Sequence, residues 1–167
     1  HLRWLFKLGD FIYSTESNVQ FIKGILNRSK ALNTDLFMAY SLSKLCTKLK
    51  KASVRRKMYE ESIKRTLFRI TSHQFIDGSF PYQSHTFKVP YLYHIIVTSL
   101  LKNFALELKD IVITHTYHNA VKYIEKNIIN ENKINWSSAN DKDKQGAIWA
   151  YSFLLNIVRK RKRFSKW

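Results

Sequence analysis

Glycine and proline are scarce in this chain of 167 residues, which contains four of the first and two of the second. Sandwiches and barrels of β-strands need many tight turns, so the shortage disfavours them. The single cysteine, Cys46, excludes an internal disulfide framework and cannot by itself form a thiolate metal site. No run of apolar residues approaches the roughly 18 that a membrane-spanning helix requires. We therefore predict no transmembrane segment.

Acidic residues are also few: 12 Asp and Glu stand against 29 Lys and Arg, which gives a formal net charge of +17. One basic cluster is the tail 159–167. A second is expected at a turn between two helices and comprises Lys48, Lys50, Lys51, Arg55, Arg56 and Lys57. Such an excess favours a polyanionic partner. An AT-rich gene would also raise Lys, Ile and Asn together, but it does not explain the shortage of Glu.

The apolar residues recur with a helical period, and they predict helices of two kinds. Helices that are apolar on nearly every side are buried, and helices with a single apolar stripe lie on the outside. Inner helices are predicted at 34–50, 90–108 and 146–158, the first with an N-cap Asn or Thr. Outer helices are predicted at 55–73, 112–129 and 18–29, and 2–13 resembles a truncated inner helix. The predicted fold class is all-α, with no β-structure beyond a short pairing.

The two kinds of helix alternate along the chain, and parts of the sequence repeat with them. Ala39-Tyr40-Ser41-Leu42 recurs two repeats later as Ala150-Tyr151-Ser152-Phe153, with Thr98-Ser99-Leu100 near the midpoint. Tyr59 corresponds to Tyr117, and Phe80 corresponds to Trp136. A repeat of about 55 residues accommodates two helices and two loops, as expected of stacked antiparallel α-hairpins.

The segment Gln74-Phe75-Ile76-Asp77-Gly78-Ser79-Phe80-Pro81-Tyr82 resembles the turn that leads into an inner helix in α/α-toroid proteins. Trp4-Leu5-Phe6-Lys7-Leu8-Gly9-Asp10 resembles a recurrent helix end of the same superfamily. The superfamily includes terpenoid cyclases, prenyltransferase β-subunits, six-hairpin glycosidases and polysaccharide lyases. The resemblance implies an incomplete α/α toroid. In the turn, Gly78 permits the tight bend, Asp77 and Ser79 hold it by local hydrogen bonds, and Phe80 or Tyr82 packs between helices.

Several members of that superfamily are disfavoured by missing residues. The chain has no Asp-rich D-x-D-D run of a cyclase, and Cys46 lacks the neighbours of a prenyltransferase zinc site. The phosphate-binding, dinucleotide-binding and serine- and zinc-hydrolase motifs are absent too. His115 and His118 have a spacing that could bind metal, but helix-start polarity explains them better, so we predict no metal and no cofactor.

The densest polar and aromatic run, 82–94, supplies the catalytic candidates His85, Tyr91 and His94. A lyase acting on a uronic acid needs a base, an acid and a group that steadies the enolate, and Tyr, His and Lys can provide these. The alternative is that His94 and the tyrosines are satisfied core residues at the start of a buried helix.

Ligand-binding candidates lie in two loops that are expected to emerge at the same end of the hairpin stack, 77–94 and 136–145. They are Asp77, Tyr82, Lys88, Trp136, Asn140 and Asp141. In the alternative interpretation, Phe80 and Trp136 only plug neighbouring hairpins, and Asn140 and Asp141 cap the following helix.

We predict one α-hairpin domain over 1–167 with a basic tail at 159–167. Because the chain opens at His1 without Met, we expect a fragment of a larger toroid, or a processed product. The expected function is carbohydrate-active or carbohydrate-binding, with an acidic polysaccharide favoured over nucleic acid. If it is an enzyme, it is a polysaccharide lyase or glycoside hydrolase. The alternative is a basic helical-repeat module that binds nucleic acid or a protein without catalysis. Localisation and oligomeric state stay open.

Overall fold

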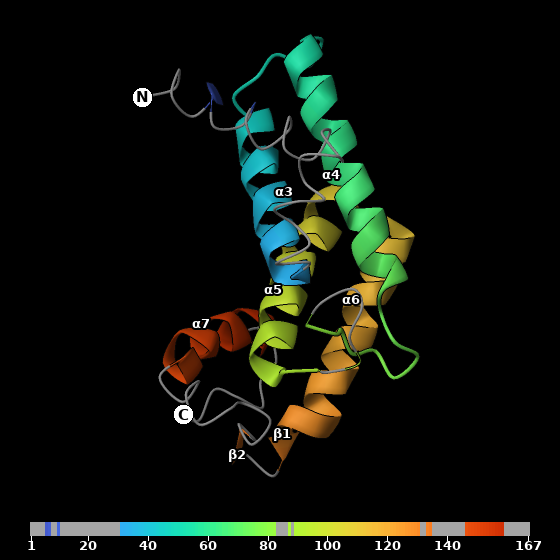
Figure 1. Ribbon diagram of the computed structural model, residues 1–167, viewed down its shortest axis with the longest axis vertical. Helices are drawn as coiled ribbons and strands as arrows, with labels where there is room; N and C mark the ends of the chain where they lie inside the picture. The colour runs from blue at the N-terminus through green and yellow to red at the C-terminus, as the bar shows by residue number, and fades with distance from the viewer. Residues whose placement is uncertain are drawn as a thin grey trace. The chain divides into compact units, whose positions relative to one another are not determined.

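The computed structural model (Figure 1) describes residues 6, 7, 10, 31–82, 87, 89–130, 133–134 and 146–158. The chain divides into two compact units, His1–Ser72 and His73–Trp167, which we describe separately. The described residues are predominantly helical, so the all-α prediction is confirmed. The helix expected at 18–29 and most of the one expected at 2–13 lie outside the described residues. No described helix is both long and apolar enough to cross a membrane.

In the first unit, helix α3 (Leu32–Cys46) packs against helix α4 (Val54–Ser72). The stripe predicted for α4 is the face that it buries: Tyr59, Ile63, Leu67 and Ile70. Residues of α3 that recur every three or four positions, Leu32, Leu36, Ala39 and Leu42, are at most 1% exposed. Two apolar faces with the helical period therefore meet to form the core of this unit.

Helix α3 begins earlier than predicted. Its N-cap is Ala31, which offers no side-chain hydrogen bond, so the prediction of an Asn or Thr cap is wrong. The amides of Thr34 and Asp35 instead both lie within reach of the Ala31 carbonyl, at 3.1 and 3.4 Å. Leu32 is 1% exposed, and its burial extends the helix toward the core by two residues. Tertiary packing outweighs the local capping preference here.

The second unit contains helix α5 (Tyr91–Leu108), which packs on both α6 (Ile111–Tyr123) and α7 (Gly146–Val158). Helix α6 continues into the π-turn η1 (Ile124–Ile128). The short strands β1 (Ile129–Asn130) and β2 (Lys133–Ile134) then pair antiparallel, as the predicted short pairing allowed. The hydrophobic core of this unit gathers residues from α5, α6, η1 and α7: Ile95, Val121, Ile124, Ile128, Leu154 and Ile157.

The share of buried residues follows the predicted inner and outer order, and in α7 three of the eight residues 150–157 are buried. Helix α5 buries ten of 18 residues, whereas α6 buries four of 13. Helix α3 buries seven of 15 residues, against six of 19 in α4. For α7 the prediction of burial on all sides is wrong over residues 150–157: Ala150, Leu154 and Ile157 are buried, but Tyr151 is 39% and Leu155 42% exposed. An apolar sequence shows that a face can be buried but cannot supply the element that covers it.

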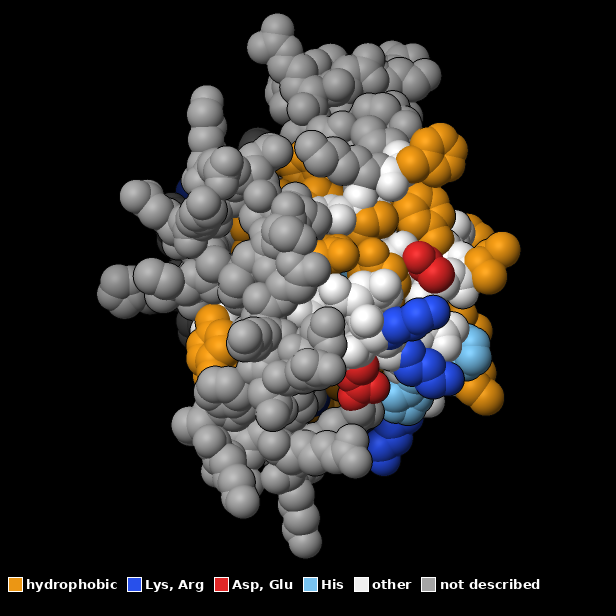
Figure 2. All heavy atoms as spheres, turned by 90° about the horizontal axis from the view of Figure 1, so that it is seen from below, with side chains coloured by type: hydrophobic (Ala, Val, Ile, Leu, Met, Phe, Trp, Pro, Cys, Tyr) orange, Lys and Arg blue, Asp and Glu red, His pale blue; other side chains and the backbone are white. Residues whose placement is uncertain are grey.

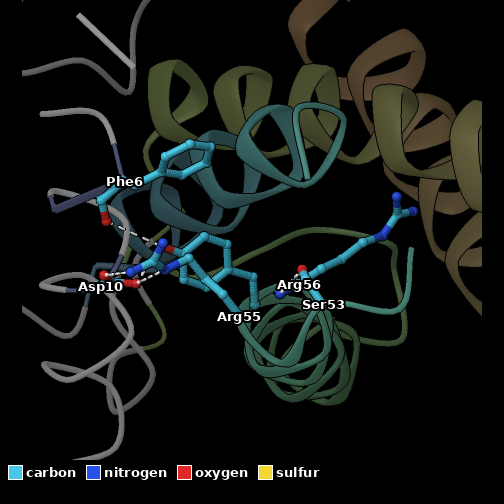
Figure 3. Close-up of polar contacts among 6 residues, drawn as sticks. Phe6, Asp10, Ser53, Arg55 and Arg56 are labelled. Carbon is cyan, nitrogen blue, oxygen red and sulfur yellow. Dashed lines mark hydrogen bonds and ion pairs between the residues drawn. The ribbon is translucent and has the colours of Figure 1, made fainter. Parts of the chain in front are cut away.

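A polar cluster connects the first unit's early residues to α4 (Figure 3). The Tyr59 ring is fully buried, and its hydroxyl donates to Asp10 Oδ1 at 2.6 Å. The Arg55 guanidinium meets the same carboxylate, with Nε 3.0 Å from Oδ1 and Nη2 2.9 Å from Oδ2. Burial, and then the hydrogen bond to Asp10, raise the pKa of Tyr59 far above its usual range. Asp10, the last residue of the Trp4–Asp10 motif, thus holds two side chains of one helix.

Replacing Tyr59 with phenylalanine removes only the hydroxyl, and it is expected to lower the free energy of unfolding by about 1–2 kcal/mol, because Asp10 loses a charge-assisted hydrogen bond. Urea unfolding followed by circular dichroism measures the change. Tyr151→Phe, at a residue that is 39% exposed, is the matched control and should be nearly neutral. Equal stability of the two variants would refute a stabilising Tyr59–Asp10 bond.

Candidate functional site

The turn between α4 and α5 has the geometry that its residues predict. Gly78 adopts a φ of +89°, a region that L-residues avoid. Its amide donates to the Phe75 carbonyl at 2.9 Å, and the Phe75 amide donates to the Ser79 carbonyl at 2.9 Å. Asp77 Oδ1 accepts from the Ser79 amide at 2.9 Å and from the Ser79 hydroxyl at 2.7 Å. Phe80 is 1% exposed, so the expected roles of Asp77, Gly78, Ser79 and Phe80 are confirmed.

The same turn is fastened to helix α6. Gln74 Nε2 donates to the Gly78 carbonyl at 3.0 Å and to the Thr116 carbonyl at 2.8 Å. A Cβ on Gly78 would lie 2.3 Å from the Asn119 carbonyl oxygen, closer than real contacts permit. Glycine is therefore required twice at this position: once by the backbone angle and once by the close approach of α6.

His94, a catalytic candidate, has both ring nitrogens engaged inside the fold. Nδ1 accepts a hydrogen bond from the Phe80 amide at 3.1 Å. Because a backbone N–H can only donate, Nδ1 carries no proton, and the proton of the neutral ring is on Nε2. Nε2 donates in turn to the Ala120 carbonyl at 3.1 Å. The side chain is 1% exposed, and burial lowers its pKa to about 4. The ring is a neutral connector between the turn, α5 and α6.

One tyrosine ring contacts His94, and three others lie at or just before the start of α5. The Tyr123 ring stands edge-on to His94, with centroids 4.8 Å apart, and Tyr91 stands edge-on to Tyr123 at 6.4 Å. Burial raises the pKa of Tyr123, and the nearby Tyr91 and Asp77 raise it further. Tyr82 packs against Tyr93 with centroids 4.4 Å apart, and both rings are half-buried. The start of α5 thus presents partly exposed aromatic rings.

Four of the predicted site residues fall in the described part of this unit: Asp77, Tyr82, Tyr91 and His94. The others lie outside the described residues: His85, Lys88, Trp136, Asn140 and Asp141. The predicted convergence of the loops 77–94 and 136–145 therefore stays a prediction. So does catalysis by His85, Tyr91 and His94, although His94 has no ring nitrogen left to exchange a proton with a substrate.

Metal-binding groups do not gather in the described part of the chain, where no three His, Cys, Asp or Glu side chains stand together. The His118 ring lies beside Tyr117, with centroids 5.4 Å apart. Cys46 is buried, and that burial raises the pKa of its thiol, which makes it a weak nucleophile and metal ligand.

The second basic cluster does lie at a helix–helix connection, as predicted. Residues 47–53 join α3 to α4, and the lysines at 48, 50, 51 and 57 are all exposed. Arg55 pairs with Asp10, and Arg56 Nε pairs with Glu60 at 2.6 Å. Another face of the molecule, seen in Figure 2, is not uniformly basic: its Lys and Arg side chains lie beside acidic, His and hydrophobic side chains. The described part of that face is mixed in charge.

The sequence did not predict the role of Gln74, which donates hydrogen bonds to backbone carbonyls of the turn and of α6. Gln74 heads the motif that resembles toroid turns, which was the available signal. Its partners are backbone oxygens of Thr116 and Gly78, and no side-chain pattern identifies them. The Asp10–Tyr59 bond joins residues 49 positions apart and carries no local signature either.

Comparison of the chain with protein-family models, with curated proteins and with solved structures finds no match. The resemblance to α/α toroids consequently rests on the residues quoted for it and stays a hypothesis.

Proposed function

We propose that this chain is a non-catalytic, basic module that binds a polyanion, and that its helices belong to an array of antiparallel hairpins of the partial α/α-toroid kind. The observation that supports it most is the lysine-rich connection between α3 and α4, which is exposed at the end of two packed helices. A net charge of +17 supplies long-range attraction to any polyanion.

The absence of catalysis is supported by the use of the candidate residues. His94 donates and accepts within the fold, and a neutral ring that is 1% exposed cannot reach a substrate. Asp77 accepts two hydrogen bonds from Ser79 and so stabilises its own turn. Both residues therefore use their polar groups to stabilise the fold, which is consistent with a binding module and does not require catalysis.

The test is retention on immobilised heparin and on duplex DNA, with binding constants measured across a salt series. We expect binding to both at low salt, with a logarithm of the affinity that falls linearly with the logarithm of salt concentration. A matched acidic or neutral protein of similar size is the control for the matrix. Failure to bind either polymer at low salt would contradict the proposal.

A second candidate, binding of an acidic polysaccharide, is favoured by the half-buried rings of Tyr82 and Tyr93 at the start of α5. Partly exposed aromatic rings provide flat apolar faces for sugar rings. Under this proposal Tyr82→Ala weakens retention on polygalacturonate but leaves duplex binding unchanged. Formation of an unsaturated uronate product would additionally favour a lyase.

A further inference from the structure

The connection between α3 and α4 is held in one shape by its own hydrogen bonds. The amides of Lys48 and Ser53 donate to the carbonyls of Leu45 and Lys50, both at 3.0 Å. Ser53 Oγ accepts from the Arg56 amide at 3.2 Å. Because the backbone is fixed in this way, the lysines that it carries start from defined positions.

The arginines beside the connection are already engaged. Figure 3 shows the side chains of Arg55 and Arg56 leaving the start of α4 in opposite directions, with Arg55 turned toward Asp10. Arg56 Nη1 donates to the Leu49 carbonyl at 3.3 Å, while its Nε binds Glu60. Both guanidinium groups therefore serve the fold, and the charges left for a partner belong to lysines.

We call the four lysines the basic corner: Lys48, Lys50, Lys51 and Lys57. All are exposed, and among the described residues none of them forms an ion pair. No Asp or Glu occurs between residues 44 and 59. The corner is thus a concentration of positive charge that the fold does not neutralise.

The basic side chains at the start of α4 are unfavourable to that helix. The first turn of α4 contains no acidic residue, yet it contains Arg55, Arg56 and Lys57. The N-terminal end of a helix carries partial positive charge, so cations there disfavour the helix rather than stabilise it. Arg55 and Arg56 offset this cost by pairing with Asp10 and Glu60, but Lys57 forms no ion pair among the described residues. A cation that is unfavourable to the helix and has no compensating gain in the fold points to a functional constraint.

The composition of the corner narrows the class of partner. Residues 44–57 contain no aromatic side chain, and the rings of Phe6 and Tyr40 beside this segment are already in contact with the cations of Arg55 and Lys44. The corner itself therefore contributes no aromatic platform of the kind on which single-stranded nucleic acids and sugar rings stack. The engaged arginines cannot form the bidentate contacts that read bases. Lysines alone contact phosphates as point charges and give no sequence information.

From these observations we infer that the basic corner binds the phosphate backbone of double-stranded nucleic acid without reading its sequence. A duplex presents about one negative charge per 1.7 Å of axis, so several lysines on one short connection can each displace a condensed counterion. This inference rests on the proposed polyanion-binding function and assigns it a site and a ligand.

The test uses the full chain and a fluorescent DNA duplex of mixed sequence, titrated over a salt series. The variant replaces all four corner lysines with glutamine, which keeps the side-chain length and helix propensity. Loss of four phosphate contacts should lower the magnitude of the logarithmic salt slope by about 3.6, and should weaken binding roughly ten-fold or more at low salt. Circular dichroism confirms that the variant is folded.

The matched control changes four exposed lysines elsewhere to glutamine: Lys7, Lys64, Lys122 and Lys126. It removes the same net charge and should retain most of the wild-type slope. Equal losses in variant and control would overturn the corner as the site while leaving the polyanion function standing. Absence of wild-type binding to any polyanion would overturn the function itself. Wild-type binding to heparin without binding to the duplex at the same low salt would overturn nucleic acid as the ligand.

Discussion

Alanine at position 78 is expected to destabilise the unit 73–167 by roughly 3 kcal/mol or more, an effect at the upper end for single substitutions. The φ of +89° at Gly78 alone costs an L-residue about 1–2 kcal/mol. The added Cβ would also lie 2.3 Å from the oxygen and 2.7 Å from the carbon of the Asn119 carbonyl. Because that neighbour is helix backbone, it cannot move aside as a flexible side chain would. Urea unfolding followed by circular dichroism measures the loss.

Two further substitutions separate the causes. Gly78→Asn tolerates the positive φ better than alanine but keeps a Cβ, so it should still be clearly destabilised. Ser79→Ala keeps the backbone and loses only the hydroxyl bond to Asp77, which is expected to cost about 1 kcal/mol. A Gly78→Ala protein within about 0.5 kcal/mol of wild type would show that α6 does not approach the turn as described.

Acidification is expected to weaken the second unit through His94. The pKa of the ring is about 4 in the folded protein and 6.5 when it is free of the fold. The unfolded chain therefore takes up the proton first, so the stabilisation is complete above pH 6.5 and is lost as the pH falls toward 4. Each unit of the difference corresponds to about 1.4 kcal/mol, which makes the total roughly 3 kcal/mol. The cause is the burial of the ring, which disfavours the charged imidazolium. Protonation of Nδ1 would in addition end its hydrogen bond from the Phe80 amide.

The measurement is the free energy of unfolding between pH 7 and 4, with NMR titration of the His94 ring as a direct readout. Asp77 and Tyr123, the titratable groups close to the ring, remain in the variant His94→Gln. This variant should be less stable at pH 7, but its stability should vary less over the window. An unchanged pH dependence in His94→Gln would assign the acid sensitivity to other groups.

Much of the architecture was predictable because it depends on short-range rules. The predicted stripe of α4 is its buried face, since residues three and four apart share a side of a helix. The turn at Asp77 and Gly78 was predictable because one residue needs a positive φ and another bonds its neighbour two positions on. The connection that carries the basic corner was predictable because the apolar periodicity stops after Cys46 and resumes at Tyr59.

Other features departed from the prediction where long-range packing decides. Helix α3 begins at Leu32 without a side-chain cap, because burial of Leu32 outweighs a capping bond from Asn33 or Thr34. Helix α7 reads as apolar throughout, yet Tyr151 and Leu155 remain partly exposed, because only one of its described faces meets α5. In both cases the deciding quantity is how much surface a neighbouring element removes from water.

The amino-acid sequence by itself determined the helical class, the places where the chain turns and the positive corner between two helices. These follow from periodicity, backbone preference and charge, which act between residues close in the chain. Only the tertiary structure decided that His94 is a neutral connector, that Tyr59 is held by Asp10, and that Gly78 must admit the backbone of α6. Those contacts join segments many residues apart, and several end on backbone carbonyls. Every residue carries such a carbonyl, so no residue type in the sequence marks the one that will be used.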